Sequence, residues 1–194
     1  MPPLIRRPEP ARRPGRALLI LVALLLPAPA SAQAGTIILA RHAEKAAPGG
    51  DPELTPEGLR RAEALAQVVA DVRLAAIFTT QFRRTRLTAA PAARAAGIAP
   101  TVLTATGNLT EDAAAVARVI DALPAGAAVL VVGHSNTVGL IITALGGPAL
   151  PDLCDGEHAT LFTLVRPADG PPHLLRSRYG AAEPPDATAC HGGR

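Results

Sequence analysis

The sequence predicts an α/β domain of three layers, with helices on both faces of a central, mostly parallel sheet. Apolar runs rich in β-branched residues alternate with segments whose apolar residues recur at helical spacing, as in layered α/β domains. Charged residues follow directly after two of the apolar runs, which is typical of the open carboxyl ends of parallel strands. The last two apolar runs follow each other without a helical segment, so they are expected to form an antiparallel pair at one edge of the sheet.

Each strand and helix has its own signal. Strands are expected near residues 36–41, 75–79, 100–103 and 127–133, and a later pair near 159–166 and 173–179. The first helix is expected over about 56–70, because Thr55 is a suitable N-cap and Pro56 a suitable first helical residue. Helical spacing predicts that its buried face consists of Leu59, Ala62, Leu65, Ala66 and Val69.

Three further helices complete the expected architecture. One covers about 83–96 and ends at Gly97, a residue suited to a helix C-terminus. The next covers about 111–123, before Pro124. The last begins near Asn136 and stops at Gly146.

Residues 1–34 precede the predicted domain and have the pattern of a secretory signal. A basic segment is followed by an apolar run of ten residues and then by small residues typical of cleavage sites, Ala30–Ala32 and Ala32–Ala34. We therefore expect a cleavable signal peptide at 1–34, a domain at 35–180, a loosely held tail at 181–194, and a periplasmic or secreted protein. The alternative is an uncleaved N-terminal anchor, although the apolar run is short for a membrane span.

The signal segment accounts for the basic character of the chain. Of 19 Lys and Arg residues and 16 Asp and Glu residues, five arginines and one glutamate fall within 1–34. The remainder has 14 basic and 15 acidic residues. We therefore expect no nucleic-acid partner and no stable membrane association after cleavage. The two cysteines, Cys154 and Cys190, are expected to form a disulfide in an exported chain, and no metal or cofactor is expected.

Four segments carry the candidate functional residues: Leu39–Lys45, Leu54–Ala62, Phe78–Ala90 and Val131–Thr137. In their order and their positions at strand and helix junctions, they resemble the histidine phosphatase superfamily, which has the phosphoglycerate mutase-like fold. The resemblance extends from about Thr36 to Gly180. Two positions depart from it. Ala43 stands where the first motif usually has glycine, and Ser135 stands where the phytase-like branch has a proton-donating aspartate.

The resemblance implies a metal-independent phosphatase in which His42 is the nucleophile and forms a phosphohistidine intermediate. Arg41 and Arg84 would bind the phosphoryl oxygens, a role that suits the planar guanidinium group. His134, protonated beside the phosphate dianion, would stabilise charge in the transition state.

Other residues have alternative roles in this pattern. Thr80 and Thr85 contact phosphate or cap the second helix, while Ser135 and Asn136 lie near a helix N-terminus and Glu44 shapes the rim of the pocket. The candidate proton donors are Glu111, Asp112, Asp155 and Glu157, although Glu111 and Asp112 suit a helix start after Thr110 even better. Arg83 and Arg86 are expected in solvent, and His158, His173 and His191 are expected to be ordinary surface or edge residues.

The leading hypothesis is therefore an exported phosphatase that hydrolyses phosphomonoesters or phosphohistidine. If no proton donor exists, substrates with good leaving groups are favoured. The alternative is a catalytically silent phosphate-binding module with the same fold. A phosphoglycerate mutase is disfavoured, because the connection Thr104–Leu109 is short and suggests an open site. The substrate is expected to be a phosphorylated small molecule or protein, and the sequence indicates no oligomeric state.

Overall fold

A computed structural model describes residues 35–46, 49–184 and 190. The expected signal peptide at 1–34 and His191 lie outside these residues. Within the described ranges, no helix combines the length and apolar character that crossing a membrane requires.

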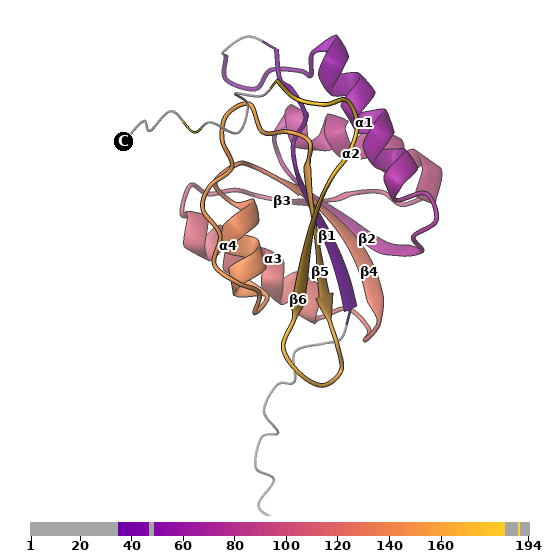
Figure 1. Cartoon of the computed structure of the whole chain (residues 1–194), viewed down its shortest axis with the longest axis vertical. Helices are drawn as coiled ribbons and strands as arrows, with labels where there is room; N and C mark the ends of the chain where they lie inside the picture. The colour runs from indigo at the N-terminus through magenta and orange to yellow at the C-terminus, as the bar shows by residue number, and fades with distance from the viewer. Residues whose placement is uncertain (1–34, 47–48, 185–189, 191–194) are drawn as a thin grey trace, which may run out of the picture. The chain divides into compact units, whose positions relative to one another are not determined.

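The described chain contains a six-stranded mixed sheet. Its strands lie in the order β3-β2-β4-β1-β5-β6 (Figure 1). Strands β3, β2, β4 and β1 run parallel, whereas β5 is antiparallel to β1 and β6 is antiparallel to β5. The six strands are β1 (Gly35–Arg41), β2 (Leu74–Thr80), β3 (Thr101–Leu103), β4 (Ala127–Gly133), β5 (Thr160–Arg166) and β6 (His173–Arg178). The predicted mostly parallel sheet with an antiparallel edge pair is confirmed.

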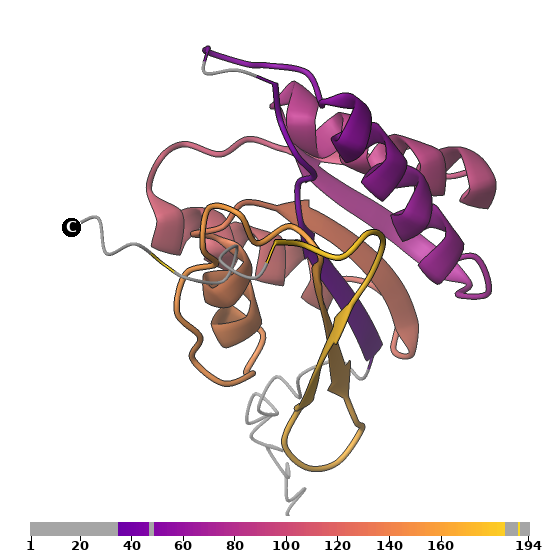
Figure 2. The same cartoon turned by 45° about the horizontal axis from the view of Figure 1, so that its top comes forward.

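Helices cover both faces of the sheet, which confirms the three layers. Helices α1 (Pro56–Val68) and α2 (Arg83–Ala96) pack together on one face, and α3 (Leu109–Asp121) and α4 (Val138–Ala144) lie on the other (Figures 1 and 2). Successive strand residues point to opposite faces, so β1 contributes to both cores. Ile37 and Leu39 pack on the α3–α4 side, and Ile38 and Ala40 pack on the α1–α2 side.

Side chains cap the starts of α1 and α3 but not those of α2 and α4, and the cap of α3 differs from the prediction. Thr55 caps α1 as predicted, since its Oγ1 accepts a hydrogen bond of 3.0 Å from the backbone N–H of Gly58. Helix α3 begins at Leu109, two residues earlier than expected, and its N-cap is Asn108 rather than Thr110. The Asn108 side chain accepts from the backbone N–H of Glu111 at 3.3 Å, so asparagine takes the capping role.

The buried face of α1 differs from the helical-spacing prediction at one position. Leu59 is 50% exposed, whereas Arg61 is 2% exposed. Arg61 is buried because its guanidinium donates to the backbone carbonyls of Tyr179 and Ala181, at 3.0 and 3.1 Å, and pairs with a carboxylate of the site described below. A charged residue with this many partners can replace a leucine in the interior.

The residues directly after Gly180 contact the domain. Ala181 accepts the bond from Arg61, and the Glu183 carboxylate accepts from the backbone N–H groups of His158 and Ala159. Glu183 also pairs with Arg178 at 2.7 Å. Ordered contacts therefore continue past the domain end that we expected at Gly180.

Candidate active site

The strand register brings the two motif histidines together. The parallel pairing of β1 with β4 aligns Arg41 with Gly133, so that His42 and His134 follow at the same edge of the sheet. The backbone N–H of His42 donates to the Gly133 carbonyl at 2.9 Å. The two imidazole rings lie edge to face with their centroids 5.5 Å apart. This edge is where open α/β sheets bind ligands.

Helix α2 follows the end of β2 (Figure 1), and Arg84 lies in the first turn of this helix. Its guanidinium lies over the Phe82 ring, 4.2 Å from the centroid, and the same ring meets His134 edge to face at 5.5 Å. The turn between β2 and α2 is fixed by Thr85, a fully buried residue. Its Oγ1 accepts from the backbone N–H of Thr80 at 3.2 Å and lies 2.9 Å from the Phe82 carbonyl. Thr85 therefore orders the turn that carries Arg84.

The hydrogen bonding of His42 leaves one ring nitrogen available for chemistry. Nδ1 lies 2.8 Å from the Ala43 carbonyl, and a carbonyl only accepts, so Nδ1 carries the hydrogen. The neutral ring then has a lone pair on Nε2. Burial lowers the pKa of His42 to about 3, and the charges of Arg41 and Arg84 act in the same direction against the opposing bond to Ala43. His42 is therefore neutral at neutral pH, as a nucleophile must be.

His134 has a similarly depressed pKa. Its Nε2 lies 3.1 Å from Thr80 Oγ1, and its backbone N–H donates to Thr137 Oγ1 at 2.9 Å. Burial lowers the pKa of His134 to about 4, with the charges of Arg84 and Arg41 acting in the same direction. With these protein groups alone, His134 is neutral at neutral pH, so the protonated form that we expected from the sequence requires a bound anion.

Arg41 is held by backbone carbonyls rather than by a carboxylate. Its Nη1 donates to the carbonyls of Cys154, Asp155 and Glu157 at 2.6, 3.0 and 3.4 Å. The Asp155 carboxylate is fully exposed and 3.9 Å from Nη2. Burial lowers the pKa of Arg41, against the opposing charges of Asp155 and Glu157. The loop before β5 thereby fixes the guanidinium through one of its nitrogens.

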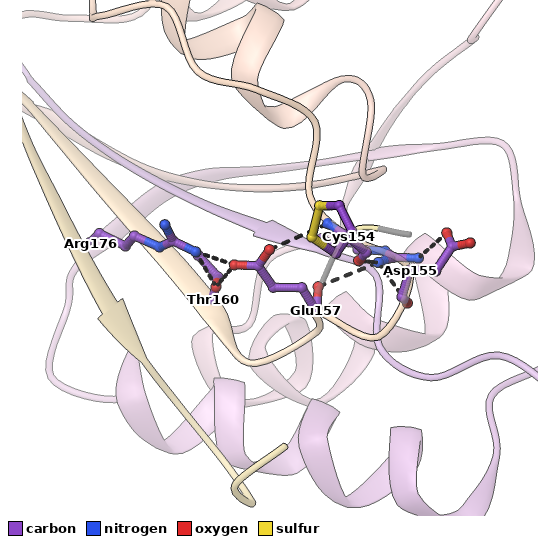
Figure 3. The surroundings of a disulfide bond; sticks show 7 residues. Cys154, Asp155, Glu157, Thr160 and Arg176 are labelled. Carbon is purple, nitrogen blue, oxygen red and sulfur yellow. Dashed lines mark hydrogen bonds and ion pairs between the residues drawn. A yellow bond between two sulfur atoms is a disulfide. The ribbon is translucent and has the colours of Figure 1, made fainter. Parts of the chain in front are cut away.

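That loop is fastened by a disulfide and a buried carboxylate (Figure 3). Cys154 and Cys190 are joined, as expected from the sequence. The Glu157 carboxylate, 3% exposed, accepts from the Cys154 N–H at 3.3 Å and from Thr160 Oγ1 at 2.7 Å, and it pairs with Arg176. Burial raises the pKa of Glu157, but these bonds and the charge of Arg176 outweigh it and lower the pKa. Glu157 is therefore ionised and stabilises the loop. An ionised carboxylate of this kind does not suit the role of proton donor.

The other two candidate donors lie in the first turn of α3. Asp112 accepts from the backbone N–H groups of Thr106 and Gly107 at 3.0 and 3.2 Å, and from Thr106 Oγ1 at 2.8 Å. Burial raises the pKa of Asp112, but these hydrogen bonds outweigh it and lower the pKa. Glu111 is exposed and accepts from Asn108 Nδ2 at 3.2 Å. Both side chains therefore order the α3 start, as the capping alternative expected.

A cavity of about 320 Å³ adjoins His134 and extends toward α3. Asn136 lines it, and Ser135 lies in the neighbouring loop, where its carbonyl accepts from the Leu153 N–H at 3.1 Å. The cavity is bounded by Phe82, Arg84, His134, Asp112 and Leu109, among others. Within the described ranges, no cluster of three or more His, Cys, Asp or Glu side chains is arranged to hold a metal ion.

Glu44 lies deeper than the pocket rim where we expected it. Its Oε1 accepts from Arg61 Nε at 2.8 Å and lies 2.7 Å from Arg61 Nη2. Burial raises the pKa of Glu44, but the bond to Arg61 and the charge of Arg61 outweigh it and lower the pKa. Helix α1 approaches so closely here that a Cβ at Gly58 would lie 2.2 Å from the Glu44 carbonyl. Glycine in the second motif therefore permits this packing.

Sequence reasoning missed three residues of the site: Arg61, Thr88 and His158. Thr88 Oγ1 accepts from the Ala43 N–H at 2.9 Å and donates to the Arg84 carbonyl at 2.7 Å, which links both motifs. Its position one helical turn after Arg84 was the available signal. His158 was expected at the surface or an edge, and this is wrong. It is 9% exposed, and its Nδ1 lies 2.9 Å from the His42 carbonyl oxygen. His173 is exposed in β6, as expected.

Comparison with known proteins supports the resemblance. Residues 37–113 match the model of the histidine phosphatase superfamily, branch 1. A search of curated proteins gives no match. Among solved structures, Bacillus stearothermophilus YhfR is 18% identical with a TM-score of 0.58, covering 73% of this chain and 95% of its own.

Two further solved structures share the fold. A protein from Nakamurella multipartitia, provisionally named phosphohistidine phosphatase SixA, is 23% identical with a TM-score of 0.53, covering 78% of this chain and 99% of its own. A mycobacterial glucosyl-3-phosphoglycerate phosphatase in complex with inorganic phosphate is 18% identical with a TM-score of 0.55, covering 76% and 97%. Residues 37–113 therefore match the histidine phosphatase superfamily model, and the described chain shares the fold of these solved structures.

Proposed function

We propose that this chain is a phosphatase that transfers a phosphoryl group from phosphomonoesters or phosphohistidine to Nε2 of His42 and then to water. The observation that carries the proposal is the Nδ1–H bond from His42 to the Ala43 carbonyl, 2.8 Å long, in a buried ring whose pKa is lowered to about 3. This arrangement keeps the Nε2 lone pair at neutral pH, next to His134 and within reach of two arginine charges.

In the first step, the Nε2 lone pair forms a bond to phosphorus as the bond from phosphorus to the leaving group breaks. Arg41 and Arg84 hold the equatorial oxygens, where charge accumulates in phosphoryl transfer. In the second step, a water oxygen attacks the same phosphorus. The electron pair of the N–P bond returns to Nε2, and inorganic phosphate leaves.

His134 changes its protonation state when the substrate binds. The charges of Arg84 and Arg41 help to lower its pKa, and a phosphate dianion beside these groups offsets those charges. The pKa of His134 therefore rises on binding, and the imidazolium donates a hydrogen bond to a phosphoryl oxygen. Thr80 Oγ1, 3.1 Å from Nε2, holds the ring in place for this task.

Two of the four candidate proton donors are carboxylates that are engaged in local hydrogen bonds, which lower their pKa values. Asp112 is engaged in the turn before α3 and Glu157 in the loop before β5. Substrates whose leaving group departs without a proton, such as phosphohistidine, anhydrides and aryl phosphates, are therefore favoured over alkyl esters. The provisional name of the Nakamurella multipartitia protein agrees with the first of these.

The simplest test is turnover of p-nitrophenyl phosphate by the mature protein and by His42→Ala. We expect kcat to fall by about 10³-fold or more, since the covalent route is removed. Undiminished turnover in His42→Ala would overturn the proposal. Binding of inorganic phosphate without turnover in the unchanged protein would instead support the silent module. Across a series of leaving groups, kcat/KM should rise steeply with leaving-group acidity.

We also propose that residues 1–34 export the chain to the periplasm or beyond. The basic and apolar pattern of that segment supports export, and the Cys154–Cys190 disulfide suits an oxidising compartment. Cell fractionation with N-terminal sequencing of the mature protein tests this. Recovery of the full-length chain in the cytoplasm would contradict it.

A further inference from the structure

His158 lies just before β5, on the antiparallel side of the sheet and next to His42. The β1–β5 register pairs Ala40 with Leu161, so the residues just before β5 lie beside Arg41 and His42. The His158 ring is 5.9 Å from the His42 ring, and its Nδ1 is 2.9 Å from the His42 carbonyl oxygen. The Glu183 carboxylate accepts from the His158 N–H, which holds the backbone that carries the ring.

The direction of this hydrogen bond is fixed by its partner. A carbonyl oxygen has no hydrogen, so Nδ1 of His158 is the donor. Burial lowers the pKa of His158, with the charge of Arg41 acting in the same direction. The neutral ring that results carries its hydrogen on Nδ1. Protonation would leave this donor in place, because both nitrogens of imidazolium carry hydrogen.

The bond completes a set that holds the peptide after the nucleophile. The N–H of His42 is bound by the Gly133 carbonyl at 2.9 Å, and the N–H of Ala43 is bound by Thr88 Oγ1 at 2.9 Å. His158 holds the carbonyl of the same peptide unit as the Ala43 N–H. The Ala43 carbonyl, one unit further, orients the His42 ring. Rotation of the held unit would move the Ala43 carbonyl and with it the ring.

We propose that His158 is a positioning residue for phosphoryl transfer: its Nδ1–H holds the His42 carbonyl and thereby keeps Nε2 of His42 in line with phosphorus. The inference rests on the proposed function of His42. It assigns a role to a histidine outside the four family motifs, contributed by the antiparallel side of the sheet. Displacements of about 1 Å at a reacting group can cost about 100-fold in rate, so a single bond of this kind has a measurable effect.

The test uses two nearly isosteric substitutions. His158→Leu removes the donor, and His158→Asn restores an N–H at the position of Nδ1. With p-nitrophenyl phosphate, we expect His158→Leu to lower kcat and the single-turnover rate of His42 phosphorylation by roughly 10- to 100-fold, with KM changed less than about threefold. His158→Asn should recover most of the rate. His173→Leu, at an exposed position, is the control and should match the unchanged protein.

Unchanged kcat in His158→Leu would overturn the inference, as would equal losses in His158→Leu and His158→Asn. If His158→Leu fails to fold, His158→Gln replaces it, because its amide lies one bond further out and misses the Nδ1 position. His158→Gln should then be slower than His158→Asn, and equal rates would overturn the inference. Failure of the proposed function looks different: the unchanged protein would then form no phosphoenzyme at all.

Discussion

The two halves of the sheet contribute to the site in different ways. The parallel half, β3-β2-β4-β1, presents the expected reacting groups at its strand ends: Arg41, His42, Arg84 and His134. The antiparallel half, β5 and β6 with the loop before them, supplies none of these. It holds Arg41 through three carbonyls and His42 through His158. Substitutions of these residues in the parallel half should therefore remove a group that takes part in the reaction. Substitutions in the antiparallel half should instead shift the positions of Arg41 and His42.

The largest effect after loss of the nucleophile itself is expected at Arg84. In the proposed mechanism, Arg84→Ala removes one of two charges that stabilise the transferring phosphoryl group, so kcat/KM should fall by about 10²- to 10³-fold. Arg86→Ala is the matched control, because Arg86 lies on the same helix turn but is exposed. Steady-state kinetics with p-nitrophenyl phosphate measure both. Equal kcat/KM values in the two variants would show that Arg84 does not take part in the reaction.

The antiparallel half is tested by opening the disulfide. In the double variant Cys154→Ser with Cys190→Ser, the free energy of unfolding should fall by about 2–4 kcal/mol. The loop that holds Arg41 is then less constrained, so KM should rise by roughly tenfold, equivalent to about 1.4 kcal/mol. A reductant should have the same effect on the unchanged protein and none on the double variant. If a reductant changes neither the free energy of unfolding nor KM of the unchanged protein, the disulfide does not support Arg41.

Acid should destabilise the protein through the buried histidines. Their pKa values are about 6.5 in the unfolded chain but about 3 for His42 and about 4 for His134 in the folded one. Below about pH 6.5 the unfolded state binds more protons, so the free energy of unfolding should fall between about pH 6.5 and 4, by more than about 1 kcal/mol. Denaturant unfolding across this range measures it. His42→Asn should show a shallower dependence, and an identical slope would contradict the neutral state of His42.

The smallest effect is expected at the start of α3. Asp112→Asn weakens the bonds that order this turn, so the free energy of unfolding should fall by about 1 kcal/mol, while kcat stays within about twofold. Glu111→Gln, at the exposed neighbouring position, should change neither quantity. A fall in kcat of about 100-fold in Asp112→Asn at unchanged stability would instead identify Asp112 as a proton donor.

The sequence predicted the strands of both halves of the sheet but missed side chains of the site in each half. Strand positions follow from runs of buried residues, and the convergence of His42 and His134 follows from parallel strand ends. Arg61 was missed because helical spacing treats arginine as polar, and its burial depends on carbonyls far along the chain. His158 was missed because its partner is set by the β1–β5 register, which no local pattern encodes. The capping choice of Asn108 over Thr110 involves two residue types with similar capping ability.

The most direct test of the account is to locate the phosphate during turnover. The protein is mixed with p-nitrophenyl phosphate, quenched in alkali within the first turnover, and digested, and the phosphopeptide is identified by mass spectrometry. We predict an alkali-stable, acid-labile phosphate on the peptide that contains His42, absent in His42→Ala. Phosphate on another residue, or rapid turnover with no phosphopeptide while His42→Ala remains active, would contradict the account.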